Sequence, residues 1–179
     1  MNETSQYSDG MNESIINQRS HTNHSKLRAC FLGDIENLAG RKEGPTHLDV
    51  ISIAEAVYKT FGMYSVFPVV ATAHCNAEPV WFNWPGARKL VKSGVDGADL
   101  KLLEVMKNED LAKRFDLVII GSCDHIFSEA ASKLASQGVR VVAALGRGRI
   151  SKRLRMAVHD VVRLPIDFYT DEEEVRISA

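Results

Sequence analysis

The fold is decided by a stretch near the amino end of the chain, Ala29-Cys30-Phe31-Leu32-Gly33-Asp34-Ile35-Glu36-Asn37. An apolar run that ends in acidic residues is typical of a strand covered on both faces, as in a parallel sheet. Two later stretches show the same order, Leu90-Val91-Lys92-Ser93-Gly94-Val95-Asp96-Gly97-Ala98-Asp99 and Asp116-Leu117-Val118-Ile119-Ile120-Gly121-Ser122-Cys123-Asp124. Because the carboxyl ends of parallel strands share one edge of a sheet, the three stretches are expected to bring their acids together there.

Strand and helix patterns alternate along the rest of the chain. The predicted strands are 27–33, 64–71, 88–92, 117–121, 139–145 and 161–164. The predicted helices are a segment capped by Thr46 that runs to Phe61, then 98–114, 125–137 and 151–159. This alternation, with short connections, predicts one α/β domain with a parallel sheet and right-handed crossovers.

Two segments are harder to interpret. Pro68 lies within the second predicted strand, and a proline there favours an edge position or an irregularity. The segment 74–86 fits a short helix and a turn, and it contains Trp81 and Trp84. These rings are expected mainly in the core, with stacking on nucleic-acid bases as the alternative.

The bulk composition excludes several classes of protein. The chain has 179 residues and a formal net charge of −1, so nothing in its overall charge indicates nucleic acid or membrane. No apolar run is long enough to cross a bilayer, and no signal peptide is recognisable. Three widely spaced cysteines favour free thiols in the cytoplasm. Residues 1–26 are polar and predicted to be disordered, 27–165 form the domain, and 166–179 form an acidic tail.

Carboxylates collected at one edge repel one another unless a cation lies among them. Oxygen ligands suit Mg²⁺ or Mn²⁺, so the sequence predicts a metal site built from Asp34, Asp99 and Asp124. Each acid also has an ordinary structural explanation. Asp34 would start a turn, Asp96 and Asp124 would cap helices, and Asp99 would favour the amino end of a helix dipole.

Positive charge is concentrated after the fifth predicted strand, in a loop that opens on the same edge. The residues expected to hold a phosphate backbone are Arg147, Arg149, Lys152 and Arg153. Ser122 and His125, beside Asp124, are expected to contact RNA as well, with His125 also able to move a proton. The alternative is a solvated basic helix face.

The order of four short motifs resembles the NYN domain family, a branch of the PIN-like ribonucleases. The motifs are Asp34-x-Glu36-Asn37, Asp96-Gly97-Ala98-Asp99, Gly121-Ser122-Cys123-Asp124-His125-Ile126-Phe127 and Ile150-Ser151-x-x-Leu154. The resemblance implies a Rossmann-like, three-layer α/β/α fold with a mostly parallel sheet, and cleavage of RNA with Mg²⁺ or Mn²⁺. By position it implies that Asp34, Asp99 and Asp124 are catalytic ligands, that Asp96 is a further metal ligand, and that Asn37 is the amide of the family's conserved motif. One position departs from the pattern, since Ile126 stands where many members carry a second aspartate.

Three functions remain open from the sequence. The first is a metal-dependent ribonuclease that leaves a 5′-phosphate and a 3′-hydroxyl. The second is an RNA-binding or regulatory module that uses the basic loop and no metal. The third is a hydrolase of small nucleotides or phosphate esters at the same edge. RNA is the expected partner, and a homodimer is one option for the oligomeric state.

Overall fold

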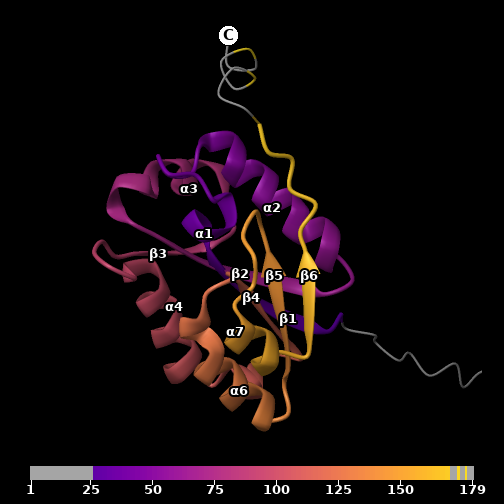
Figure 1. Cartoon of the computed structure of the whole chain (residues 1–179). Coiled ribbons are helices and arrows are strands. Elements are labelled where there is room, and N and C mark those ends of the chain that lie inside the picture. The colour runs from indigo at the N-terminus through magenta and orange to yellow at the C-terminus, as the bar shows by residue number, and fades with distance from the viewer. Residues whose placement is uncertain (1–25, 170–172, 174–175, 177–179) are drawn as a thin grey trace, which may run out of the picture.

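The chain is described as a computed structural model over residues 26–169, 173 and 176. Its centre is one six-stranded sheet with the strand order β3-β2-β1-β4-β5-β6 (Figure 1). All five strand pairings are parallel. This order is that of a doubly wound Rossmann sheet, in which the order of the strands reverses between β1 and β4. The predicted α/β layered fold is therefore confirmed.

Each observed strand begins and ends within one residue of its prediction. The strands are β1 (Arg28–Asp34), β2 (Ser65–Thr72), β3 (Arg88–Val91), β4 (Leu117–Gly121), β5 (Arg140–Leu145) and β6 (Asp160–Arg163). The apolar runs fixed these bounds because both faces of the central strands are buried. In β4, for example, every residue is buried.

The helices agree with prediction except in three respects. The observed helices are α1 (Ile35–Ala39), α2 (His47–Phe61), η1 (His74–Asn76), α3 (Ala77–Asn83), α4 (Gly97–Asn108), α5 (Leu111–Arg114), η2 (His125–Phe127), α6 (Ser128–Ser136) and α7 (Lys152–Ala157). Of these, α1 was not predicted, two predicted helices are interrupted, and α7 is shorter than the predicted 151–159. The helix predicted over 98–114 is two helices, because Asp110 adopts a left-handed backbone with φ of 49°. The helix predicted over 125–137 begins as a turn of 3₁₀ helix and ends near Gly138, whose φ is +89°.

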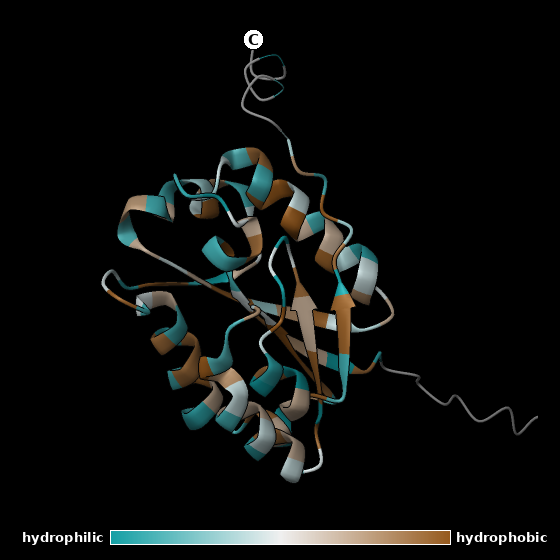
Figure 2. Cartoon of the chain, viewed as in Figure 1, coloured by the Kyte–Doolittle hydropathy of each residue, from teal (hydrophilic) through white to brown (hydrophobic). Residues whose placement is uncertain are grey.

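Two apolar layers cover the sheet. Alternate residues of β1 point to opposite faces: Ala29 and Phe31 pack with α1, α2 and α3, whereas Cys30 and Leu32 pack with α4 and α6. Figure 2 shows the same arrangement, with apolar colours along the strands and polar colours on the outer sides of the helices. Both faces are therefore closed, and the ends of the strands are left for chemistry.

Pro68 was predicted to mark an edge strand or an irregularity. β2 as a whole is not an edge strand, but its first half has no neighbouring strand on one side. β2 lies between β1 and β3, so it is not an edge strand. Pairing with β3 starts only at Val69, opposite Arg88. The missing N–H of Pro68 therefore faces a side where no neighbouring strand exists, and it costs the sheet no hydrogen bond.

The remaining segments divide between surface and core. Trp84 is buried against Phe31, with ring centroids 5.7 Å apart, whereas Trp81 is exposed. The domain continues past residue 165, because Ile166 is buried and Phe168 packs on the same layer. The predicted disordered tail falls almost wholly outside the described residues, as does most of the acidic end of the chain. Among the residues described, no helix has the length and apolar character needed to cross a membrane.

Candidate functional site

Two of the predicted acids interact directly at the carboxyl edge of the sheet. Asp34 is the last residue of β1, and Asp99 lies in the first turn of α4. Both are almost fully buried, with 6% and 7% of their surfaces exposed. A side-chain hydrogen bond links the two carboxyl groups, while Asp99 Oδ1 is buried without a hydrogen-bond partner in the described part of the chain. Asp49 Oδ1 is also buried without a hydrogen-bond partner among the described residues, so the feature that marks this place is the close approach of two buried carboxyl groups, which makes it a candidate functional site.

The pair holds a proton near neutral pH. Burial and the negative charge of Asp34 raise the pKa of Asp99 to about 8, and the charges of Asp124 and Asp96 add to the effect. Burial also raises the pKa of Asp34, although the backbone N–H of Asn37 and the hydrogen bond from Asp99 oppose it. The two carboxyls therefore titrate as a coupled unit, with the shared proton on Asp99.

Asp124 lies at the rim of the pair and is partly exposed. It follows β4 and caps η2, since its Oδ1 accepts a hydrogen bond from Ile126 N at 3.1 Å. The same oxygen lies 2.7 Å from His125 Nδ1, and the His125 side chain is 63% exposed. The structural role and the predicted chemical role thus belong to the same carboxylate, which orients an imidazole toward solvent.

Asp96 contributes charge rather than a cap. It occupies the position before α4, but it has a left-handed backbone with φ of 54° and makes no side-chain capping hydrogen bond. Its side chain is exposed and its charge acts on Asp99. Asp96 is therefore available to a ligand, although it lies farther out than the buried pair.

Asn37 and Ser122 serve as positioning residues. Asn37 Oδ1 accepts a hydrogen bond from Cys123 N at 3.0 Å, so the amide joins the helix after β1 to the segment after β4. Ser122 is completely buried, and its hydroxyl accepts a hydrogen bond from Asp124 N at 3.2 Å. The predicted contact between the Ser122 side chain and RNA is therefore wrong, because the hydroxyl is turned inward and holds Asp124.

Glu36 is a site residue whose role sequence reasoning missed. Its Oε1 accepts three hydrogen bonds, from Thr72 Oγ1 at 3.0 Å, Ala73 N at 2.7 Å and Asn76 Nδ2 at 2.8 Å. These bonds tie the end of β1 to the end of β2. The only sequence signal was its place between two other polar residues of the first motif, which does not distinguish a ligand from a brace.

The basic loop crosses the end of β4, beside the acids. Ser151 N donates to Cys123 O at 2.9 Å, and a Cβ on Gly148 would lie only 2.7 Å from Cys123 Sγ. Arg163, which was not predicted, donates to the carbonyl oxygens of Gly146 and Gly148 and so holds the loop from β6. The loop is thus fixed on both sides, against β4 and against β6.

The four predicted basic side chains are exposed, and one is partly engaged. They are Arg147, Arg149, Lys152 and Arg153. The guanidinium of Arg147 lies 4.1 Å from the ring centroid of Phe168, a cation–π contact that fixes its direction. The other three remain on the surface around the start of α7, where an anionic chain has access to them.

The donor set suits a hard cation only in part. Carboxylate oxygens are the correct ligand type, and the unpartnered Asp99 oxygen would accept a cation in place of the shared proton. However, no group of three or more His, Cys, Asp or Glu side chains within residues 26–169, 173 and 176 is arranged to hold a metal ion. Mg²⁺ is commonly bound by one or two carboxylates, with water and substrate phosphates completing its shell, so a two-carboxylate site remains chemically adequate.

Comparison with other proteins supports the fold and leaves the function open. No family model matches the sequence, and no curated protein is similar enough to count as a relative. Among solved structures, a crystal structure of a protein of unknown function from Vibrio parahaemolyticus RIMD 2210633 is similar, with a TM-score of 0.59 and 16% sequence identity. The match covers 80% of this chain and 96% of that protein. At this level of identity the similarity defines the class, a layered α/β protein, and nothing finer.

Proposed function

We propose that the protein is a metal-dependent ribonuclease whose site is the carboxyl edge of the sheet. The observation that carries the proposal is the buried Asp34–Asp99 pair with its unpartnered oxygen. Two buried carboxyls cost folding free energy unless a cation or a proton neutralises one of them. A divalent cation, when bound, would offset the negative charge of the phosphodiester at the reacting centre.

The residues around the pair supply the remaining parts of such a site. Asp124 orients His125, whose exposed ring is placed to exchange a proton with a substrate oxygen. Arg149, Lys152 and Arg153 lie on the rim, where they would hold the sugar-phosphate chain. Asn37 and Glu36 fix the strand ends, so the carboxylates need little rearrangement. The resemblance to the NYN family, Mg²⁺ or Mn²⁺ as cofactor, RNA as partner and a cytoplasmic location belong to this proposal.

The first test is cleavage of a labelled single-stranded RNA with Mn²⁺, with Mg²⁺ and with chelator. Wild type should cleave the RNA only when Mn²⁺ or Mg²⁺ is present. Asp99→Asn and Asp124→Asn should lose cleavage and keep their fold. Asp110→Asn is the matched control, because Asp110 is an exposed aspartate that precedes α5 and pairs with Lys113. Cutting that survives chelator, or turnover by Asp99→Asn equal to that of wild type, would reject the site.

A second function, RNA binding without cleavage, is favoured by one observation. Ile126 is packed against the core at the position where the resemblance places a second acid. In that case wild type retains RNA without cutting it, and Arg149→Glu with Lys152→Glu releases the RNA. Arg155→Glu, an exposed arginine on the same helix, serves as the control. Binding that depends on salt in wild type and loses part of that dependence in the double variant would place phosphate contacts on the loop.

A further inference from the structure

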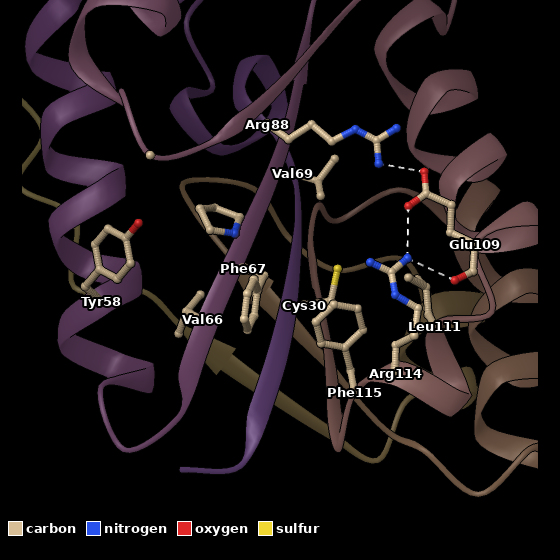
Figure 3. Close-up of a pocket in the computed structure, with 12 residues that line it drawn as sticks. Cys30, Tyr58, Val66, Phe67, Val69, Arg88, Glu109, Leu111, Arg114 and Phe115 are labelled. Atoms are coloured by element: carbon tan, nitrogen blue, oxygen red, sulfur yellow. Dashed lines mark hydrogen bonds and ion pairs between the residues drawn. The ribbon is translucent and has the colours of Figure 1, made fainter. Parts of the chain in front are cut away.

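A cavity lies at the opposite end of the sheet from the acids (Figure 3). It exists because β3 begins opposite Val69 and leaves the first half of β2 without a neighbour on that side. The space of about 300 Å³ is bounded by the start of β2, by Tyr58 of α2 and by the junction of α4 and α5. A volume of this size lies at the small end of the range for small-molecule sites.

Aromatic and aliphatic side chains form one part of the walls of this cavity. Phe67 and Phe115 meet edge to face with their ring centroids 5.6 Å apart, and Phe67 is 43% exposed. Leu111 and Val69 are buried beside them, with the Cys30 thiol at the base. Burial raises the pKa of Cys30 to about 12, so this wall is uncharged. An aromatic ring entering the cavity would meet the rings of Phe67 and Phe115, which also have the Arg28 guanidinium 5.2 Å from each centroid.

The mouth of the cavity carries an excess of positive charge. Glu109 is shared by two arginines, at 2.6 Å from Arg88 Nη1 and 3.3 Å from Arg114 Nη1. One carboxylate between two guanidinium groups leaves a net charge of +1. The Nε and Nη2 donors of both arginines have no hydrogen-bond partner in the described part of the chain. In Figure 3 the Arg114 guanidinium lies between Glu109 and Cys30, so some of its donors face the cavity.

An added β-strand is a poor occupant of this space. Ser65 donates its N–H to Leu27 O, so odd-numbered residues of β2 face β1 and even-numbered ones face the gap. In the unpaired half of β2 the even positions are Val66 and Pro68, and proline has no N–H. The gap therefore presents one backbone donor, too few for strand pairing.

We propose that this cavity binds a small aromatic carboxylate, with its ring beside Phe67 and Phe115 and its carboxylate on Arg88 and Arg114. The phenyl rings of the wall favour an aromatic ring, and the two guanidinium groups, which already hold the Glu109 carboxylate, favour a carboxylate on the ligand. The site does not touch Asp34 or Asp99, so it is independent of the proposed nuclease function.

The test uses phenylacetate as probe. Phenylacetamide, which has the ring without the charge, and inorganic phosphate, which has charge without a ring, are the comparison compounds. Titration of the full chain is followed by NMR of labelled methyl groups, including those of Leu111 and Val69. A ligand of this size is expected to bind with a millimolar dissociation constant. Phenylacetate should shift the cavity methyls, and the amide and phosphate should bind at least tenfold more weakly. Equal binding of acid and amide, or no shift at the cavity, would overturn the proposal.

Variants sharpen the test without disturbing the core. Arg88→Gln and Arg114→Gln should each weaken binding about tenfold, because each removes charge-assisted hydrogen bonds. Glu109→Gln should strengthen binding several-fold, because it removes the competing carboxylate. Arg140→Gln, an exposed arginine paired with Asp160, is the matched control and should bind as wild type does. Asp99→Asn should also bind normally. Arginine variants that bind like the control, or an unchanged Glu109→Gln, would refute the assignment.

Discussion

The first turns of α2 and α4 carry the same pattern and use it in opposite ways. Thr46 and Asp96 precede the two helices, and each is followed three residues later by a buried aspartate, Asp49 or Asp99. In α2 the capping box forms, and Asp49 also lies 2.6 Å from Arg41 Nε. In α4 the cap is absent, and Asp99 turns to a second acid. Asp49 therefore stabilises the folded protein, whereas burying Asp99 beside a second acid lowers the stability of the folded protein.

The largest expected effect lies on the α2 side of this comparison. Replacing Arg41 with Met should leave Asp49 buried without its cation, and removing one partner of a buried pair costs about 3–5 kcal/mol. Urea unfolding monitored by circular dichroism measures the loss. Arg155→Met, an exposed basic residue, should unfold as wild type does. A loss for Arg41→Met no larger than that of the control would mean that the pair is not stabilising.

Glu36 provides an intermediate case, a carboxylate satisfied by three neutral donors. Glu36→Ala should leave the buried Thr72 hydroxyl and the Ala73 N–H without their acceptor, at a cost of about 2–3 kcal/mol. The same unfolding experiment measures it, with Glu55→Ala on the exposed side of α2 as the control. If the two variants have equal stability, the three bonds do not brace the strand ends.

The acid pair predicts that cation binding depends on pH. Because the pair holds one proton up to a pKa of about 8, binding of Mn²⁺ must release that proton. The dissociation constant for Mn²⁺ should therefore fall about tenfold for each unit of pH between 6 and 7.5. Electron paramagnetic resonance of free Mn²⁺ measures this without any substrate. A constant that does not change with pH would place the metal away from the pair.

The smallest expected effect has the opposite sign. Asp99→Asn should raise the free energy of unfolding by about 0.5–2 kcal/mol at pH 8, in metal-free buffer. The folded state binds the Asp99 proton more tightly than the unfolded state does, so wild type loses stability as pH rises from the ordinary value of 3.8 to about 8. At pH 4 the variant and wild type should therefore differ less. An equal gain in stability at both pH values would show that burial of the ionised Asp99 carboxylate is not the cause.

The sequence predicted local structure well where a run of apolar residues determines it, as in the buried strands. Buried parallel strands require unbroken apolar runs, and such runs indicated the central strands, such as β4, to within one residue. The approach of Asp34 to Asp99 also followed from the topology, since Asp34 ends β1 and Asp99 lies in the first turn of the helix that follows β3. The break between α4 and α5 did not, because Asp110 adopts a backbone that its side chain only weakly favours.

Long-range polar contacts were the part of the site that the sequence did not reveal. Glu36 bonds to residues 36 to 40 positions away, and Arg163 reaches back 17 positions to Gly146. Such partners depend on where the sheet order brings each side chain, and no periodicity records it. Ser122 was misassigned for the same reason. Its place after a strand suited a phosphate, whereas full burial turned its hydroxyl inward.

The adjacent residues Glu36 and Asn37 bind in opposite directions across the sheet, Glu36 to the end of β2 and Asn37 to the segment after β4. One helical turn therefore spans three strand ends where a doubly wound sheet would otherwise open into a crevice. The amide hydrogens of Ala73 and Cys123 should in consequence exchange with solvent deuterium at the rate of global unfolding. The backbone at the carboxyl edge of the sheet would then be rigid, and only the side chains around it would move to hold a substrate.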